Sequence, residues 1–349
     1  MGRGVTTRLP ALLGEHCPAH RYAVIADHKV AGLLGGSLLQ LLAGAGLDTQ
    51  LFEFPAGEWN KTRDQWSALT DRMLAAGLGR DSAVIAFGGG VAGDLAGFVA
   101  ATFLRGVPCV QLPTTLLAMI DSSVGGKTGV DVPAGKNLVG AFHQPRFVLA
   151  DIETLASLPR AHVASGMAEA IKHGVIRDAG YFESLADAAA CLGKDLDRLE
   201  DVVLRSIAIK AAVVTEDERE AGLRAILNFG HTVGHAVESL SGFDLLHGEA
   251  VAIGMHVEAR IAESSGIAAA GLADVVARQL ERYALPLTVP ASLPTERLLE
   301  AMQLDKKTRA ARVRFALPRE MGRMAQSGDG AWTVEVDSGV IRQALDTVR

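Results

Sequence analysis

The feature that most constrains the fold is a short β-branched run at residues 83–87, which leads directly into a glycine-rich turn at 88–97. Short apolar runs ended by turn residues are typical of buried strands in a parallel sheet. The expected strands are 22–26, 83–87, 107–112 and 147–150, and the expected helices between the first two strands are 30–46 and 62–77. Because strand and helix patterns alternate, residues 1–152 are predicted to form an α/β domain with a parallel sheet.

The rest of the chain has a different pattern, in which long Ala- and Leu-rich segments show helical periodicity. The expected helices are 163–176, 181–192, 196–215, 223–240, 248–264 and 269–283. Two alternating segments, 313–317 and 332–336, predict a small extended region near the end. The 349 residues suffice for two cores, so a second, mainly helical domain is expected at 153–349.

Composition excludes several classes of protein. The net charge of −6 argues against a nucleic-acid partner held on a broad basic surface. The longest apolar stretch carries Asp94 and several glycines, which a membrane helix would not. Cys17, Cys109 and Cys191 are scattered, as in a protein of the reducing cytoplasm. We therefore expect a soluble cytoplasmic protein that binds no nucleic acid and no membrane and acts on a small phosphorylated molecule.

A cluster of histidines is the strongest chemical signal. His231 and His235 are four residues apart and lie on one face of the predicted helix 223–240, and His247 follows closely. This spacing is typical of a divalent metal site or a proton-transfer site. The alternative is a helix with one exposed and one buried histidine.

Two further pairs belong to the same predicted helical domain. Glu169 and Lys172 are three residues apart, which suits either a surface ion pair or a third metal ligand at Glu169. Arg224 lies four residues before Asn228 on the predicted histidine helix, so both side chains are expected to face one ligand.

Two segments of the first domain are candidates for phosphate binding. The turn at 88–97 lets the backbone approach a diphosphate at a helix N-terminus, although such glycines also serve tight packing. Asp94 beside it suits a hydrogen bond to a nucleotide or a helix N-terminus. In the loop 113–137, Lys127, Lys136 and Asn137 supply donors for a phosphate. An NTPase loop is disfavoured because its first glycine would fall at Ile120.

Taken in order, these motifs resemble the 3-dehydroquinate synthase family of the sugar-phosphate cyclases over residues 20–320. The resemblance implies a Rossmann-like N-terminal domain and a helical C-terminal domain. It implies a phosphate-eliminating lyase of the shikimate pathway that converts 3-deoxy-D-arabino-heptulosonate 7-phosphate (DAHP) into 3-dehydroquinate. The implied steps are transient oxidation by NAD, phosphate elimination, reduction, ring opening and aldol closure, in a homodimer that binds Zn²⁺ or Co²⁺.

The resemblance also assigns residues. The implied metal ligands are Glu169, His231 and His247, whereas His235 contacts the substrate and assists proton transfer. The other implied substrate contacts are Lys127, Asn137, Lys172, Lys210, Arg224, Asn228, Lys306 or Lys307, and Arg105, which reaches the substrate across the dimer interface. The implied NAD contacts are Asp27, Glu58, Lys61, Gly89, Gly90, Val91, Asp94, Thr114, Thr115, Asp121 and Lys136.

Three other functions compete with this one. Relatives in the superfamily act on substrates that lack a carboxylate, so the carboxylate-binding side chains Arg224 and Asn228 favour the dehydroquinate reaction, and aminodehydroquinate synthase remains the nearest rival. The iron-dependent alcohol dehydrogenases share the two-domain plan but would release NADH. A non-catalytic NAD-binding protein would have no physical reason to keep three dispersed metal ligands.

Overall fold

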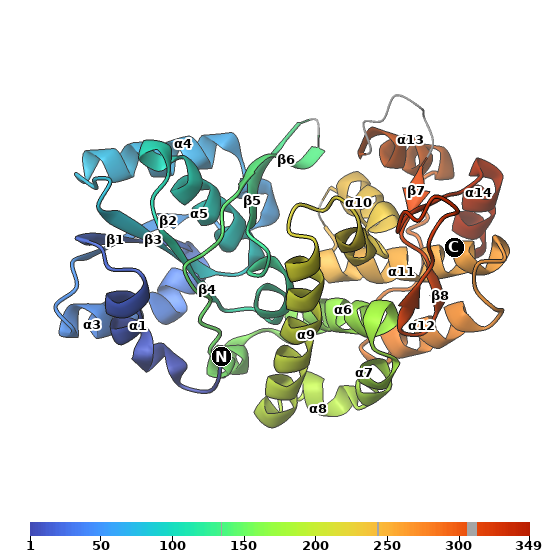
Figure 1. Ribbon diagram of the computed structural model, residues 1–349, viewed down its shortest axis with the longest axis horizontal. Coiled ribbons are helices and arrows are strands. Elements are labelled where there is room, and N and C mark those ends of the chain that lie inside the picture. Colours follow the sequence, from blue (N-terminus) through green and yellow to red (C-terminus); the bar gives the residue numbers. More distant parts are fainter. Residues whose placement is uncertain (134, 243, 306–312) are drawn as a thin grey trace. The chain divides into compact units, whose positions relative to one another are not determined.

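A computed structural model describes residues 1–133, 135–242, 244–305 and 313–349. The chain forms two compact units, Met1–Leu158 and Pro159–Arg349, each with its own core (Figure 1). The boundary predicted at 152/153 lies at the start of a 3-10 helix, η6 (Ile152–Ser157), that leads to the end of the first unit. Within the described residues, no helix combines the length and apolarity needed to cross a membrane.

The first unit is built on a four-stranded parallel sheet with the strand order β2-β1-β3-β4 (Figure 1). The strands are β1 (Arg21–Asp27), β2 (Thr49–Phe54), β3 (Ser82–Gly88) and β4 (Cys109–Pro113). In the register, Val24 of β1 pairs with Leu51 on one side and with Ile85 on the other. The predicted α/β fold class with a parallel sheet is confirmed.

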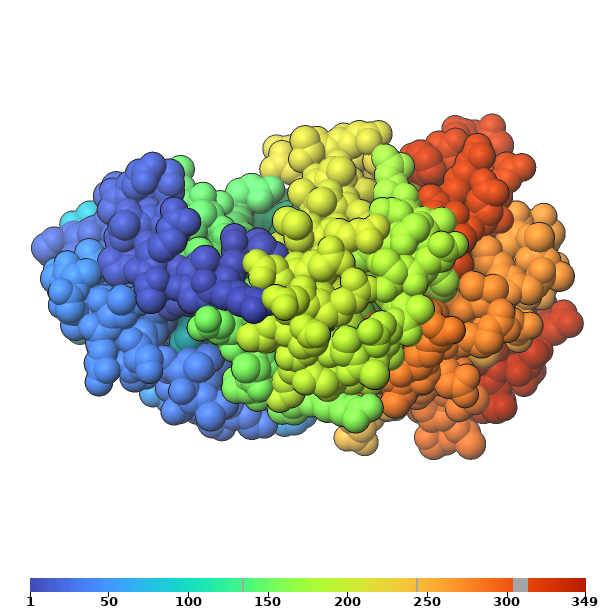
Figure 2. All heavy atoms as spheres, turned by 90° about the horizontal axis from the view of Figure 1, so that it is seen from below, coloured from blue at the N-terminus to red at the C-terminus, as the bar shows by residue number. Residues whose placement is uncertain are grey.

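Helices cover both faces of this sheet. Because successive side chains of a strand point to opposite faces, each strand contributes to two apolar clusters. Ala23 and Ile25 belong to one apolar cluster, and Val24 and Ala26 belong to the cluster on the opposite face. The helical segments are η1 (Val5–Arg8), α1 (Leu9–His16), α2 (His28–Val30), η2 (Ala31–Gly35), α3 (Gly36–Gly44), η3 (Glu58–Asn60), α4 (Arg63–Ala75), α5 (Gly90–Thr102), η4 (Phe103–Arg105) and η5 (Ala118–Ser122). Atoms of the N-terminal residues, which include α1, are seen in dark blue on the face shown in Figure 2.

The strand prediction fails in three places, one of which is the edge strand β2, which was not expected. Residues 147–150 form no strand but a single bridge between Val148 and Gln111, flanked by two backbone hydrogen bonds to Gln111. The second half of the loop expected at 113–137 instead belongs to an antiparallel hairpin of β5 (Lys127–Val132) and β6 (Gly135–Phe142). Gly129, which was part of the expected loop, and Gly140 are needed in this hairpin because they bring the two backbones into close contact.

The second unit is mainly helical, as predicted. Its helical segments are α6 (Arg160–Arg177), α7 (Ala179–Ser184), α8 (Ala188–Leu192), α9 (Leu196–Glu216), η7 (Leu223–Asn228), α10 (His231–Leu240), α11 (His247–Ser264), α12 (Leu272–Arg282), α13 (Thr295–Asp305) and α14 (Ser338–Thr347). The expected extended region consists of two short antiparallel pairs, β7 (Arg314–Phe315) with β10 (Val334–Glu335) and β8 (Pro318–Glu320) with β9 (Arg323–Met324).

One helix prediction is wrong in a way that matters for the site. The single helix expected at 223–240 is broken after Asn228, and α10 starts at His231. Gly230 lies between the two segments with φ +80°, a left-handed conformation that ends one helix and precedes the next. Arg224 and Asn228 therefore lie on the 3-10 helix η7 and not on the histidine helix.

Candidate active site

Three helices of the second unit bring the predicted metal ligands together. Glu169 projects from α6, His231 is the first residue of α10, and His247 is the first residue of α11. The Glu169 Oε1 atom lies 3.5 Å from His231 Nε2 and 3.4 Å from His247 Nε2. One ligand atom from each residue lies within 4.8 Å of the other two. The arrangement presents one oxygen and two nitrogen donors to a common point.

Close packing of α10 against α11 makes this possible. A Cβ atom on Gly254 of α11 would lie 1.9 Å from the backbone oxygen of Gly230. A Cβ atom on Gly230 would in turn lie 2.5 Å from the Met255 side chain. Glycine is therefore required on both sides of this contact, which joins the start of α10 to the middle of α11. The ring centroids of His231 and His247 are 5.4 Å apart.

Charge at the cluster is unusual because Glu169 is fully buried. Burial raises its pKa, but the Lys172 ammonium and then the His231 imidazole outweigh burial and hold the pKa of Glu169 well below its usual range. Lys172 is itself buried and forms an ion pair with Glu169 Oε2. The pair is therefore a buried one, and not the surface i,i+3 pair that was one reading of the sequence.

The cluster fits a divalent metal ion. Among the described residues, neither oxygen of the Glu169 carboxylate accepts a hydrogen bond of normal geometry, although two imidazole nitrogens face it. Burial, and then the Lys172 charge, hold the pKa of His231 well below its usual range. One carboxylate and two imidazoles are a donor set that Zn²⁺ and Co²⁺ accept.

A residue that the sequence analysis missed lies behind His247. The Nδ1 atom of His247 lies 3.5 Å from Glu238 Oε2 on α10, so that Nε2 is left facing Glu169. Burial lowers the pKa of His247, but the neighbouring Glu169 and Glu238 carboxylates outweigh burial and raise it to about 10. A carboxylate behind a ligating histidine commonly fixes the ring orientation. Its sequence signal was the i, i+4, i+7 stripe of His231, His235 and Glu238.

The other predicted substrate residues of this unit lie on α9, α10 and η7. His235 lies one turn beyond His231, with ring centroids 5.2 Å apart. Lys210 is buried on α9, and the element η7, which carries Arg224 and Asn228, packs against both α6 and α9. Arg224 is buried and donates from Nη1 to the backbone oxygen of Glu218.

Asn228 is held by a neighbouring loop, since its Nδ2 atom donates to Glu220 Oε1 at 2.8 Å.

The remaining predicted substrate residues are elsewhere in the chain. Lys306 and Lys307 lie outside the described residues. The first unit contains Lys127 at the start of β5, Asn137 on β6 and Arg105 at the end of η4.

A second charged cluster, in the first unit, surrounds Lys61. This lysine is almost fully buried, and its Nζ atom lies 2.7 Å from Glu58, 3.3 Å from Asp94 and 3.7 Å from Asp131. Lys136 Nζ lies 3.0 Å from the same Glu58 carboxylate. Burial, opposed by Lys61, raises the pKa of Asp94 to about 6. Four of the predicted NAD contacts are thus gathered in one place, with Asp131 as a member that no sequence signal had indicated.

The other predicted NAD contacts lie where strands end. Asp27 ends β1 and caps α2 through the backbone N–H groups of Lys29 and Val30. The strand β3 leads through Gly89 and Gly90 into α5, and the backbone N–H of Thr114, after β4, donates to Gly88. Val91 lies on α5, Thr115 follows Thr114, and Asp121 lies on η5. The carboxyl ends of parallel strands are the usual place for a nucleotide in such a sheet.

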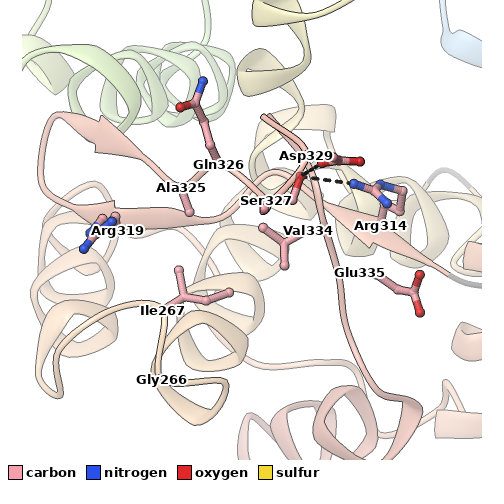
Figure 3. A pocket seen from close by; sticks show the side chains of 11 residues that line it. Gly266, Ile267, Arg314, Arg319, Ala325, Gln326, Ser327, Asp329, Val334 and Glu335 are labelled. Atoms are coloured by element: carbon pink, nitrogen blue, oxygen red, sulfur yellow. Dashed lines mark hydrogen bonds between the residues drawn. The ribbon is translucent and has the colours of Figure 1, made fainter. Parts of the chain in front are cut away.

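A cavity in the second unit is not part of the candidate site. It has a volume of about 570 Å³ and lies between the turn at Gly266–Ile267 and the C-terminal extended segments (Figure 3). Arg314 and Asp329 in its wall are both bonded to Ser327. The described residues that line it include none of the predicted ligands or substrate contacts.

Comparison with known families agrees with both parts of the chain. The family model described as 3-dehydroquinate synthase N-terminal matches residues 51–165, and the model described as 3-dehydroquinate synthase C-terminal matches residues 166–308. The chain belongs to the 3-dehydroquinate synthase family.

Relatives of this family match almost the full chain. The 3-dehydroquinate synthase of Symbiobacterium thermophilum is 48% identical over 352 residues, covering 100% of this chain and 97% of the relative. That of Pelobacter propionicus is 48% identical over 320 residues, covering 90% of this chain and 89% of the relative. The predicted family is confirmed, and with it the predicted 3-dehydroquinate synthase activity.

Solved structures of other sugar-phosphate cyclases share the fold of this 3-dehydroquinate synthase family member. A 2-deoxy-scyllo-inosose synthase, complexed with carbaglucose-6-phosphate, NAD⁺ and Co²⁺, is 26% identical with a TM-score of 0.90, covering 100% of this chain and 96% of the other. A 2-epi-5-epi-valiolone synthase from Streptomyces hygroscopicus, with NAD⁺ and Zn²⁺ bound, is 28% identical with a TM-score of 0.90, covering 100% and 95%.

Proposed function

We propose that the chain converts DAHP into 3-dehydroquinate and phosphate in the shikimate pathway, with NAD and Zn²⁺ or Co²⁺ as cofactors. The observation that carries the proposal is the convergence of Glu169, His231 and His247 on one point in a member of this family. Related cyclases with NAD⁺ and Co²⁺ or Zn²⁺ bound support the choice of cofactors.

The residues of the chain divide into two binding sets. Glu169, His231 and His247 would hold the divalent ion, and the Lys61 cluster with the glycine turn before α5 would hold NAD. When bound, the ion supplies a Lewis acid and NAD supplies a reversible hydride acceptor, so that the reaction is redox-neutral overall.

The remaining side chains act on the substrate directly. Lys172, Lys210 and Arg224 are buried cations, and a buried cation binds a carboxylate or phosphate more strongly than an exposed one does. They would hold the flexible acyclic part of the substrate in one conformer, which favours intramolecular ring closure. His235, next to His231 on α10, would accept and return a proton at the reacting carbon chain.

The proposal predicts a redox-neutral assay. Purified protein incubated with DAHP, catalytic NAD and Co²⁺ or Zn²⁺ is expected to release phosphate and form 3-dehydroquinate in equal amounts, with no lasting NADH absorbance. A chelator is expected to stop turnover, and added metal to restore it. NADH that accumulates would instead indicate a dehydrogenase. Turnover of an amino analogue in preference to DAHP would indicate aminodehydroquinate synthase.

We also propose a homodimer of the cytoplasm in which Arg105 reaches the substrate of the partner subunit. Light scattering is expected to give twice the chain mass of 36.6 kDa. Arg105→Ala and His247→Ala homodimers are each expected to be inactive. In their mixed dimer, however, one site keeps His247 and receives an intact Arg105, so co-expression is expected to restore about a quarter of wild-type activity. No recovery would mean that Arg105 serves its own subunit.

A further inference from the structure

Glu258 is a fully buried carboxylate that binds the start of a helix to which it does not belong. It lies on α11. Its Oε2 atom accepts the backbone N–H of Gly230 at 2.7 Å, and its Oε1 atom accepts that of Val233 at 3.0 Å. Gly230 is the residue before α10, and Val233 is the third residue of that helix. Glu258 therefore caps α10 from the neighbouring helix.

The cap has to come from outside because α10 cannot supply one. An N-terminal cap is usually the side-chain oxygen of the residue before the helix. That residue is Gly230, whose φ of +80° and contact with Met255 both exclude a side chain. Glu258 fills this role from one turn beyond Met255, where a carboxylate also benefits from the positive end of the α10 dipole.

A buried carboxylate is costly at this position, which argues for a specific role. The residues around it on α11, Val257, Ala259 and Ile261, are fully buried apolar residues. Taking a charge out of water is unfavourable unless hydrogen bonds compensate for the lost hydration. An apolar side chain would fill the space without that penalty, but it would leave the two N–H groups without this acceptor.

The two bound N–H groups enclose the backbone of His231. Since Glu258 holds the residue before His231 and a residue two positions after it, the peptide from which this imidazole projects is fixed on both sides. The helix that carries Glu258 starts at His247. One carboxylate thus links the backbones that bear two of the three proposed ligands.

We propose that Glu258 is a positioning residue for the metal centre, which sets the His231 imidazole, and with it His235, relative to His247. The inference rests on the metal site proposed above. Both oxygens of Glu258 accept backbone N–H groups of α10, on either side of His231. Its effect on the metal is therefore exerted through the backbone of α10.

The test is Co²⁺ binding by the metal-free full-length protein, measured as Kd by competition with a chelator and as the visible absorption of the bound ion. Glu258→Gln keeps the shape of the side chain but turns one acceptor into a donor that faces a backbone N–H. Its Co²⁺ affinity is expected to fall about 10- to 100-fold, with a changed absorption spectrum. Glu258→Asp keeps the charge but shortens the reach, and an intermediate loss is expected.

Two control variants separate positioning from general stability. Asp337→Asn weakens the cap of α14, where Asp337 accepts the N–H of Gly339 at 2.8 Å. Ile341→Val trims a buried side chain of the same helix. Both are expected to lower the melting temperature while Co²⁺ affinity and absorption stay as in the wild type.

The inference is overturned if Glu258→Gln binds Co²⁺ within about two-fold of the wild type with the same spectrum, or if the controls weaken binding equally. If Glu258→Gln does not fold, Glu258→Asp is judged by the same two measurements. A wild-type protein that binds no Co²⁺ would contradict the metal site itself, and this failure is visible before any variant is compared.

Discussion

Replacement of His247 by alanine is expected to lower kcat/KM for DAHP by about 1,000-fold or more, with the fold retained. His247 supplies one of the two imidazoles of the proposed metal site, and a catalytic metal contributes several kcal/mol to the stabilisation of developing charge. The side chain is a quarter exposed and starts a helix, so its removal leaves no large cavity. Steady-state kinetics and the metal content of the purified variant measure the effect.

The matched control is His256→Ala, on the same helix. His256 Nδ1 lies 2.9 Å from the backbone oxygen of Leu287, away from the cluster, so the variant loses a local hydrogen bond worth about 1 kcal/mol. We expect its kcat/KM and metal content to stay close to those of the wild type. If His247→Ala retained both metal and turnover, His247 would have no place among the ligands.

The fold class was predictable because the buried strands form continuous apolar runs in the sequence. All residues of β3 are buried, and its β-branched run ends in the glycine turn that starts α5. The edge strand β2 was missed because only Phe52 and Phe54 of its residues are buried, so the segment lacks a continuous apolar run. Residues 147–150 have such a run, yet a single bridge to β4 is all they form.

The break before α10 shows what a local pattern omits. Residues 223–240 keep a helical pattern throughout, and no proline marks the break. Its cause is the packing of Gly230 against Met255 and Gly254 on α11, together with the carboxylate of Glu258. Those residues are more than twenty positions away along the chain, so a window of local sequence could not reveal them. The same packing brings the His247 imidazole to 3.4 Å from Glu169 Oε1, so that His247 completes the set with Glu169 and His231.

Replacement of Lys61 by methionine is expected to have the largest effect on stability. Its ammonium is buried beside the carboxylates of Glu58, Asp94 and Asp131. Removing one partner of a buried ion pair costs about 3–5 kcal/mol, and we expect about 2–4 kcal/mol here because the carboxylates keep some contact with water. Thermal unfolding at pH 8 should show a melting temperature lower by about 5–10 °C. Lys29→Met, at an exposed lysine of the same unit, should change it little.

The loss of stability in Lys61→Met should also depend on pH, and protonation of the carboxylates determines whether the loss grows or shrinks as pH rises. Burial already raises the pKa of Asp94 to about 6 although Lys61 opposes the rise, so removal of Lys61 should raise it further. The pKa of an aspartate in an unfolded chain is about 3.9. The folded state therefore binds the Asp94 proton more tightly than the unfolded state does, and stability falls as pH rises from the unfolded pKa to the folded one. Lys61 itself has a pKa raised by the same carboxylates, despite opposing burial, and stays charged throughout this range in the wild type. The deficit of Lys61→Met should therefore be full at pH 8 and shrink toward pH 5, where Asp94 takes up a proton in place of the missing ammonium. A deficit of the same size at both pH values would mean that lost packing, and not charge compensation, is what Lys61 contributes.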